Sequence, residues 1–265
     1  MVFIRFKCER NILVMNVKPR FSIITICYNS ESTIGKTVES IEKQKKDLFE
    51  FIVIDGLSSD GTLKKVNKLK SKINIKIISE KDDGIYNAMN KGLKIAEGEW
   101  IIFINSDDWL EENILEVLET KYKKYFYDEN IVAIYGDINK VDENEKYLKT
   151  EKPNENIKEK IKIGMPIFHQ AIFIRNNVYN VLNGFDESFK IAGDWDFIAR
   201  MDNANLIFKY IPYVISNFRI GGESSNSHIF ERHRVRKKNK LYRCVDVNMI
   251  VEYLVYLKRK WKLNE

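Results

Sequence analysis

The sequence is poor in cysteine, proline and glycine. Its three cysteines, Cys8, Cys27 and Cys244, form no closely spaced pair of the kind that binds zinc, and their odd number leaves one without a disulfide partner. A disulfide-stabilised secreted domain is therefore not expected, and a cytoplasmic location is favoured. Only 4 prolines and 12 glycines among 265 residues exclude a collagen-like or low-complexity chain.

Long apolar runs are also missing. The best candidate, residues 249–257, has about half of the roughly 18 residues that span a bilayer, and Glu252 interrupts it. Residues 1–20 carry five basic side chains but no apolar core and no small-residue cleavage site. We therefore predict an N-terminal extension and no signal peptide, with Met15 as an alternative start.

Positive charge is in modest excess and gathers near the C-terminus. The formal net charge is +6, and much of it lies in residues 231–240 and 258–260. Such runs contact phosphates or anionic lipid headgroups, or remain as a solvated, partly frayed tail, and both alternatives stay open. Peripheral contact with the inner face of the plasma membrane is thus a hypothesis. No helix-turn-helix or zinc-finger pattern accompanies the charge, so nucleic acid is not an expected partner.

The first half of the chain alternates apolar strands with amphipathic helices. Strands are predicted at residues 21–27, 51–54, 73–78 and 100–104. Between them lie three helical patterns, with apolar faces that include Ile34, Val38 and Ile41, then Leu63, Val66 and Leu69, then Ile85, Ala88, Met89 and Leu93. This order predicts an α/β fold, with a doubly wound, mostly parallel Rossmann-like sheet and helices on both faces.

The second half is less regular. We predict a helix at 111–125, strands at 131–135, 171–174 and 206–215, a helix that starts at Asp194, and a solvated loop with some helix at 142–160. A further helix is expected at 245–261. The predicted domains are the extension at 1–20, a catalytic domain at 21–222 with halves at 21–110 and 111–222, and a basic, partly helical tail at 223–265.

Acidic and polar residues follow several predicted strands, at the edge where parallel sheets bind ligands. The sharpest cluster, Asn105-Ser106-Asp107-Asp108, suits a hard cation such as Mg²⁺ or Mn²⁺, and it equally suits a turn that caps the next helix. Asp55 is placed to accept hydrogen bonds from a base or ribose.

Two other acidic segments allow two readings each. Asp83 precedes Gly84, where backbone can approach a ligand closely, and a plain loop explains the same residues. Asp194 and Asp196 flank Trp195, and a carboxylate there either takes a proton from a sugar hydroxyl or caps a helix. Spacing alone leaves both choices open.

Five segments in register resemble the inverting family 2 glycosyltransferases with the GT-A fold, over residues 21–222. They are Thr25-x-x-Tyr28-Asn29, Asp55-Gly-x-Ser-x-Asp60-Gly-Thr62, Asp83-Gly-Ile-Tyr-Asn-Ala-Met-Asn-Lys-Gly92, Asn105-Ser-Asp-Asp108 and Gly193-Asp-Trp-Asp196. The stretch 83–108 is similar to bacterial colanic-acid, capsule and O-antigen biosynthesis enzymes. The resemblance implies transfer of a sugar, with inversion, from a nucleotide-sugar (UDP-linked by family habit) to a glycan or lipid-linked acceptor.

The resemblance also implies residue roles. Donor-binding residues would be Thr25, Tyr28, Asn29, Asp55, Asp83, Lys91 and Asn105. Asp107, with Asp108, would bind Mn²⁺ or Mg²⁺, although Asn105 stands where the family has an acidic residue and this weakens the expected metal site. Asp194 would be the catalytic base, with Asp196 as second choice. The acceptor side or diphosphate closure would involve His169, Gln170, His228 and Arg232, with a core histidine and a disordered tail as alternatives.

The same residues bear on three competing functions. A sugar-phosphate nucleotidyltransferase needs a glycine-rich loop after the first strand, and an NAD-binding dehydrogenase needs G-x-G-x-x-G there. Tyr28-Asn29-Ser30 occupies that turn, and the next glycine is Gly35. A non-catalytic scaffold in a polysaccharide assembly complex remains an alternative because of Asn105. The oligomeric state is not indicated.

Overall fold

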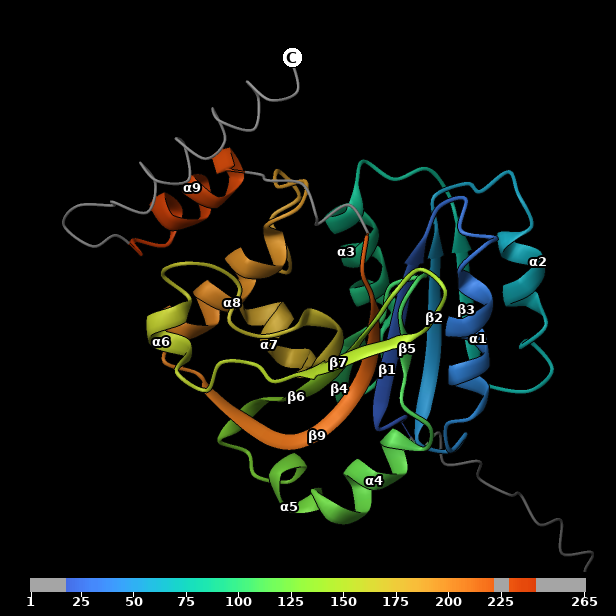
Figure 1. The fold of residues 1–265 in the computed structure, drawn as a ribbon, viewed down its shortest axis with the longest axis horizontal. Helices are drawn as coiled ribbons and strands as arrows, with labels where there is room; N and C mark the ends of the chain where they lie inside the picture. Colours follow the sequence, from blue (N-terminus) through green and yellow to red (C-terminus); the bar gives the residue numbers. More distant parts are fainter. Residues whose placement is uncertain (1–17, 222–228, 242–265) are drawn as a thin grey trace, which may run out of the picture.

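The computed structural model describes residues 18–221 and 229–241. They contain a nine-stranded sheet of order β3-β2-β1-β4-β8-β6-β9-β5, with β7 paired to β6 (Figure 1). The strands are β1 (Phe21–Cys27), β2 (Phe49–Asp55), β3 (Ile75–Ser79), β4 (Trp100–Phe103), β5 (Trp109–Leu110), β6 (Ile131–Val141), β7 (Tyr147–Glu151), β8 (Ile172–Arg175) and β9 (Ile207–Arg219). The helices are α1 (Ile34–Glu42), α2 (Thr62–Asn67), α3 (Ile85–Ile95), α4 (Ile114–Lys121), α5 (Lys123–Phe126), α6 (Ile157–Lys160), α7 (Asn176–Val181), α8 (Gly193–Asn203) and α9 (Ile229–Lys238), with a 3₁₀ turn η1 at His169–Ala171.

The first four strands are parallel, as their continuous apolar sequences predict. In β1, Phe21 pairs with Phe49 of β2 and with Trp100 of β4. The register then places Cys27 beside Asp55, and Asp55 beside Ser79 of β3. The residues that follow these strands therefore share one edge of the sheet.

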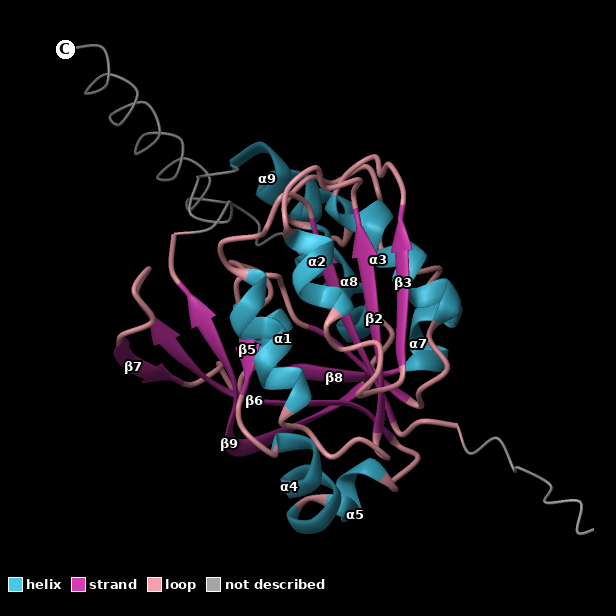
Figure 2. Cartoon of the chain, turned by 90° about the vertical axis from the view of Figure 1, so that its right-hand side faces the viewer, coloured by secondary structure: helices cyan, strands magenta, loops and turns pink. Residues whose placement is uncertain are grey.

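Two apolar cores lie on the two faces of this sheet because successive side chains of a strand point to opposite faces. Ile23 of β1 belongs to the core shared with α1, α2, α4 and α5. Its neighbour Ile24 belongs to the core shared with α3, α7, α8 and α9. Figure 2 shows α1 and α2 in front of the strands, with α7 and α8 behind them. The predicted α/β fold with helices on both faces is confirmed.

The second half adds antiparallel strands that the sequence predicted only in part. β6 extends to Val141, and its outer half pairs with β7 inside the segment predicted as a loop. That prediction was wrong for residues 147–151, because β7 is an edge strand with four exposed residues in a row and carries no apolar alternation. Its helical part is confirmed by α6. The predicted helix at 111–125 is two shorter helices, α4 and α5.

The described part of the basic C-terminal segment is helix α9, and it packs on the protein. Val235 and Arg236 of α9 are buried, and Val235 belongs to the same core as α3 and α8. The alternative of a frayed tail is therefore wrong for residues 229–241. His228, the proposed domain boundary at 222 and the predicted helix at 245–261 lie outside the described residues. Among the residues that the structure describes, no helix is long and apolar enough to cross a membrane.

Candidate active site

The ends of β1 and β2 form the first part of the site. Tyr28 follows β1 and is 64% exposed, and Gly56 follows β2. A Cβ atom on Gly56 would lie 3.4 Å from the Tyr28 ring and 2.6 Å from the Asp82 carboxylate. Glycine therefore lets the aromatic ring and Asp82 approach the same stretch of backbone, and an exposed ring beside a carboxylate is a surface on which a nucleobase can stack.

Asp55 and Asn29 fix the loops beside this surface. Asp55 is buried, and its Oδ2 accepts hydrogen bonds from the Ser58 backbone N–H (3.1 Å) and the Ser79 hydroxyl (2.6 Å). Asn29 has a left-handed backbone (φ 46°), and its Oδ1 accepts a 2.9 Å bond from the Ser59 N–H. Both predicted donor residues thus lie at this edge, where they hold the 56–62 loop against β1.

The remaining predicted donor residues on this side lie in different surroundings. Thr25 is buried within β1, and its hydroxyl has no hydrogen-bond partner among the described residues. Asp83 is exposed, whereas Asp82, which the prediction did not single out, faces Gly56. Lys91 on α3 donates to the Lys81 carbonyl (2.6 Å) and pairs with Glu80 (2.9 Å), so it braces the loop before α3.

The turn after β4 brings the second cluster to the same edge. Asp108 is fully buried, and its Oδ1 accepts a 3.0 Å bond from the Arg219 backbone N–H while its Oδ2 accepts a 3.1 Å bond from Asn105. Burial, and then the charge of Asp107, raise the pKa of Asp108 well above its ordinary value. Oδ1 thus holds this turn to the end of β9, and Oδ2 closes the turn on itself through Asn105.

Asp107 has the more accessible carboxylate of the pair. It is half-buried, and no hydrogen bond from another described residue reaches its side chain. Burial raises its pKa, against the opposing influence of its own backbone N–H, Arg219 and His169. The described ranges contain no group of three or more His, Cys, Asp or Glu side chains that could hold a metal. Any cation here needs oxygen ligands from a substrate in addition to Asp107.

The first turn of α8 presents Asp194. Its Oδ1 accepts a 2.7 Å bond from the Trp195 backbone N–H, and the Tyr86 hydroxyl lies 3.3 Å from the same atom. The Tyr86 ring packs against Gly193, where a Cβ atom would lie 2.7 Å from it. Burial and the charge of Asp194 raise the pKa of Tyr86 well above its ordinary value, so the phenol stays a proton donor. A carboxylate at a helix N-terminus is also stabilised by the helix dipole.

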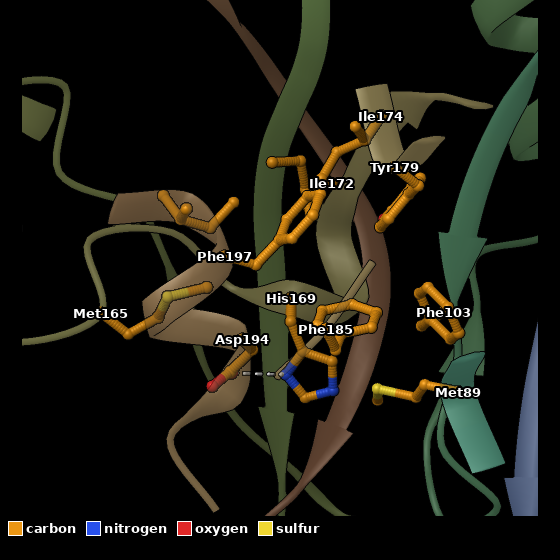
Figure 3. A pocket seen from close by; sticks show the side chains of 11 residues that line it. Met89, Phe103, Met165, His169, Ile172, Ile174, Tyr179, Phe185, Asp194 and Phe197 are labelled. Carbon is orange, nitrogen blue, oxygen red and sulfur yellow. Dashed lines mark ion pairs between the residues drawn. The ribbon is translucent and has the colours of Figure 1, made fainter. Parts of the chain in front are cut away.

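His169 connects the two acidic clusters. Its Nδ1 lies 3.7 Å from Asp194 Oδ2, and its Nε2 lies 3.1 Å from Asn105 Nδ2 (Figure 3 shows the Asp194 side). Burial lowers the pKa of His169, although Asp194 and then Asp107 oppose this, so the imidazole is neutral at pH 7. His169, Asn105 and Asp194 therefore lie close together, although His169 is 64 positions from Asn105 and 25 positions from Asp194 in the sequence.

Asp196 lies on the same helix but faces away from this place. It is fully buried, and its carboxylate accepts hydrogen bonds from Arg200 (2.9 Å), Lys238 (2.9 Å) and Asn239 (2.8 Å). These partners tie α8 to α9. Asp196 thus links α8 to α9 in this structure, and its role as second choice for the catalytic base stays a prediction.

The other predicted acceptor-side residues have separate positions. Gln170 is buried beside His169 in η1. Arg232 donates a 3.0 Å bond to the Ile163 carbonyl and lies over the Trp195 ring, so it links the segment after α6 to α8. His228 lies outside the described residues. Neither contact of Arg232 is one that sequence spacing could indicate.

Besides Asp82, the sequence does not predict a role for three further residues of the site. Arg219 ends β9, and its backbone N–H and Nε contact Asp108 and the Asp107 carbonyl. Glu231 accepts hydrogen bonds from the backbone N–H groups of residues 190–192, directly before α8. Tyr86 lies within the segment 83–92 that carries the family resemblance, but the sequence alone indicates no role for it. Only Tyr86 carried a signal, as the aromatic residue that follows Asp83-Gly84-Ile85.

Known proteins resemble the chain in sequence and in fold. The family model described as glycosyl transferase family 2 matches residues 22–182. A PGL/p-HBAD biosynthesis glycosyltransferase of Mycobacterium bovis is 26% identical over 246 residues, which cover 92% of this chain and 91% of that protein. Residues 1–349 of S. aureus TarS, in complex with UDP-GlcNAc, match with a TM-score of 0.66 at 23% identity, over 83% of this chain and 65% of that one. A mannosyltransferase of Pyrobaculum calidifontis, in complex with GDP-Man and Mn²⁺, matches with a TM-score of 0.61 at 18% identity, over 84% and 64%.

Proposed function

The chain belongs to glycosyl transferase family 2, and we propose that it is an inverting enzyme that transfers a sugar from a UDP-linked donor to a hydroxyl of a bacterial surface glycan. Sugar transfer itself follows from the family and from the relative that spans 92% of the chain. The inverting course, the UDP nucleotide and the roles of individual residues are the parts that we propose. The UDP-GlcNAc complex of the similarly folded TarS supports the choice of nucleotide.

One observation carries the proposal: His169 lies between Asp194 and Asn105. The candidate base lies 3.7 Å from one ring nitrogen, and the turn that carries Asp107 lies 3.1 Å from the other. A displacement at an anomeric carbon needs the base for the acceptor and the charge-stabilising group for the leaving diphosphate on opposite sides of one small space. The contacts of His169 with Asp194 and Asn105 support such an arrangement at this sheet edge.

The donor side is assigned from the same edge. The exposed Tyr28 ring stacks on the base, and Asp82 accepts hydrogen bonds from the base or ribose beside Gly56. Asp55 acts through the loop that it fixes, because Ser58 and Ser79 occupy its Oδ2. We therefore expect Asp82 to contribute more to nucleotide affinity than the exposed Asp83.

A divalent cation is a common requirement in this family, and the residues present fit one with a single protein carboxylate. Asp107 is half-buried with a raised pKa and no hydrogen bond from a neighbouring residue to its side chain, which is the state of a carboxylate that a cation would stabilise. Mg²⁺ and Mn²⁺ sites often use one carboxylate and complete their shell with substrate phosphates and water. When bound, the cation supplies charge neutralisation at the diphosphate.

Asp194 then removes the proton from the attacking hydroxyl. Its Oδ1 is held by the Trp195 N–H, so Oδ2 is the oxygen that faces His169 and the incoming acceptor. Neutral His169 keeps Asn105 and Asp194 at a fixed separation without adding a positive charge that would weaken the base. General base catalysis of this kind contributes roughly 10²–10⁴-fold to the rate.

The acceptor that we propose is a glycan or lipid-linked glycan, met at an anionic membrane surface. In α9 most basic side chains donate hydrogen bonds to the protein, namely Arg232, Arg234, Arg236 and Lys238. Exposed Lys237 of α9 and Lys240, just after the helix, are therefore the charges that the described part of this segment offers to lipid. Flotation on vesicles with and without phosphatidylglycerol tests this, and equal flotation of wild type and Lys237→Glu/Lys240→Glu would refute it.

Replacement of Asp194 tests the catalytic proposal. Asp194→Asn keeps the shape of the side chain but removes the base, so we expect kcat to fall by about 10²–10⁴-fold while the dissociation constant of UDP stays within about twofold. Turnover is followed as release of UDP from a panel of UDP-sugars with Mn²⁺. Asp202→Asn, on the same helix, is the matched control and should keep full activity.

Two outcomes would contradict the assignment. Unchanged turnover in Asp194→Asn would move the base to another carboxylate, and negligible turnover in wild type with every donor would favour a non-catalytic scaffold. EDTA should also abolish turnover, and added Mn²⁺ or Mg²⁺ should restore it. Full activity in EDTA would remove Asp107 from the mechanism.

A further inference from the structure

An apolar pocket opens directly beside the Asp194 carboxylate. Its walls come from α3, β4, η1, β8, α7, α8 and the loops between them, and its lining residues are Met89, Phe103, Met165, His169, Ile172, Ile174, Tyr179, Phe185, Asp194, Phe197 and Ile198 (Figure 3). Only Met165, His169 and Asp194 are half-buried, while the other lining side chains are buried. These three residues therefore form the rim, and the rest form the floor.

The floor is almost entirely apolar where it faces the pocket. Tyr179 stacks on Phe197 with ring centroids 4.7 Å apart, and Phe185 contacts both rings at 5.7 Å and 5.1 Å. Below its open rim the pocket offers about 20 Å³ of accessible space, enough for one group of water or methyl size. Apolar walls disfavour an ordered water there, because such a water finds too few hydrogen-bond partners.

We propose that this pocket binds a methyl group on one of the two sugars that meet at Asp194, and so selects a 6-deoxy or N-acetyl sugar. The inference rests on the proposed function, since Asp194 marks where the donor carbon and the acceptor hydroxyl come together. A methyl group fills the space and leaves no polar atom without a partner. The two polar rim groups, Asp194 and His169, remain available to the ring hydroxyls.

A hydroxymethyl group in the same position is disfavoured for a physical reason. Its hydroxyl needs more volume than the floor of the pocket provides. The hydroxyl also loses its hydrogen bonds to water there, and the apolar walls offer it no acceptor. Hydrophobic pockets separate groups that differ by one methylene or one hydroxyl by about 10–200-fold in kcat/KM. That range is the selectivity expected here.

The methyl group can belong to the donor sugar or to the acceptor sugar. Pairs of substrates with and without the methyl group distinguish these two possibilities. For the donor, turnover of UDP-6-deoxyglucose and UDP-N-acetylglucosamine is compared with that of UDP-glucose. For the acceptor, an aryl 6-deoxyglucoside is compared with the aryl glucoside, with the best donor held fixed. A preference of about 10-fold or more for the methyl-bearing member of either pair supports the pocket and identifies which sugar enters it.

A rim substitution links the preference to the pocket. Met165→Phe places a larger side chain at the mouth, and we expect it to lower kcat/KM for the methyl-bearing substrate by about 10-fold or more while UDP affinity stays unchanged. Leu93→Phe, in the same core but away from the lining, is the matched control. If Met165→Phe unfolds in thermal denaturation, Met165→Ala replaces it, and the widened mouth should then reduce the preference for methyl to less than about threefold.

Failure of this inference is distinguishable from failure of the proposed function. If the wild-type protein released UDP from none of the donors, the transferase proposal itself would be refuted. Wild type that transfers sugar, but treats both members of each pair alike, would overturn the methyl pocket and leave the transferase in place. The pocket would also be refuted if Met165→Phe lowered turnover of every substrate by the same factor.

Discussion

Gly193 is the residue on which the position of Asp194 most directly depends. A Cβ atom there would lie 2.7–2.8 Å from three carbons of the Tyr86 ring, closer than real Cβ contacts come. The ring is buried between α3 and α8, so it cannot swing out to solvent. Absence of a side chain at Gly193 is therefore what lets Tyr86 bring its hydroxyl to Ile191 and Asp194.

We predict that Gly193→Ala lowers kcat by about 10-fold or more and destabilises the fold by about 1–3 kcal/mol, because the added methyl overpacks the contact with Tyr86. Donor turnover and thermal unfolding measure the two effects. Gly164→Ala is the control, since the nearest atom to its Cβ, on Arg232, is 3.6 Å away, an ordinary contact. Equal activity and stability of the two variants would show that the first turn of α8 adjusts without consequence.

At the scale of elements, α9 supports the start of α8 from outside. Glu231 accepts bonds of 2.6, 2.8 and 3.0 Å from the N–H groups of Lys190, Ile191 and Ala192. These residues end at Gly193, where α8 begins and where its N–H groups have no partner within the helix. The carboxylate thus orders the segment that leads into Asp194.

We predict that Glu231→Ala destabilises the protein by about 1–3 kcal/mol, since three backbone donors lose a charged acceptor. Turnover should fall more than UDP affinity, because the loss lies on the acceptor side of the site. Both are measured against Glu129→Ala, which removes an exposed glutamate before β6. A change no larger than that of the control in either measurement would mean that α9 does not position Asp194.

The elements also differ in how well the sequence predicts them. β1 to β4 and their helices are predictable because β1, β2 and β4 are buried on both faces, β3 is partly buried, and each helix is buried on one face. Burial therefore appears in the sequence as a regular pattern of apolar residues. β7 has four consecutive exposed residues and is held by backbone pairing with β6. Its sequence therefore shows no alternation of apolar and polar residues. Helix α9 is strongly basic, and its burial depends on partners such as Asp196 that lie 42 positions away.

The residues of the site also divide into those that the sequence predicts and those that it does not. Asp55, Asn105, Asp107 and Asp194 stand out in sequence because polar residues follow an apolar strand or open a helix. The contact between His169 and Asn105 spans 64 residues, and that of Arg219 with Asp108 spans 111. Such contacts arise from strand order, with β8 and β9 inserted beside β4 and β5, and no local pattern records that order.

At the scale of the whole molecule, ion pairs attach helix α9 to the second half of the chain. Asp186, in the loop before α8, accepts a 2.8 Å bond from Lys238 of α9 and a 2.9 Å bond from the Ser188 backbone N–H. Burial raises the pKa of Asp186, but the bonds from Lys238 and Ser188 outweigh it and hold that pKa well below its ordinary value. Lys238 also reaches the buried Asp196, so one side chain joins two acidic residues.

The lowered pKa sets the sign of a pH effect. A carboxyl group whose folded-state pKa is below its unfolded value, about 3.9 for aspartate, contributes stability above that unfolded value. The contribution disappears as the pH falls through the folded-state pKa. We therefore predict that wild type exceeds Asp186→Asn in Tm by roughly 2–4 °C at pH 7, as expected for about 1 kcal/mol in a chain of this size, and that the difference begins to shrink below about pH 4 and continues to shrink as the pH falls further.

Asp128→Asn is the matched control for this experiment. Asp128 also accepts a hydrogen bond from the backbone N–H two residues later, but it forms no ion pair with a lysine among the described residues. Thermal unfolding of the three proteins between pH 2 and pH 8 therefore isolates the contribution of Lys238. A difference between wild type and Asp186→Asn that stayed constant over this range, or that grew as the pH fell, would show that α9 is held by its apolar contacts through Val235 and not by this pair.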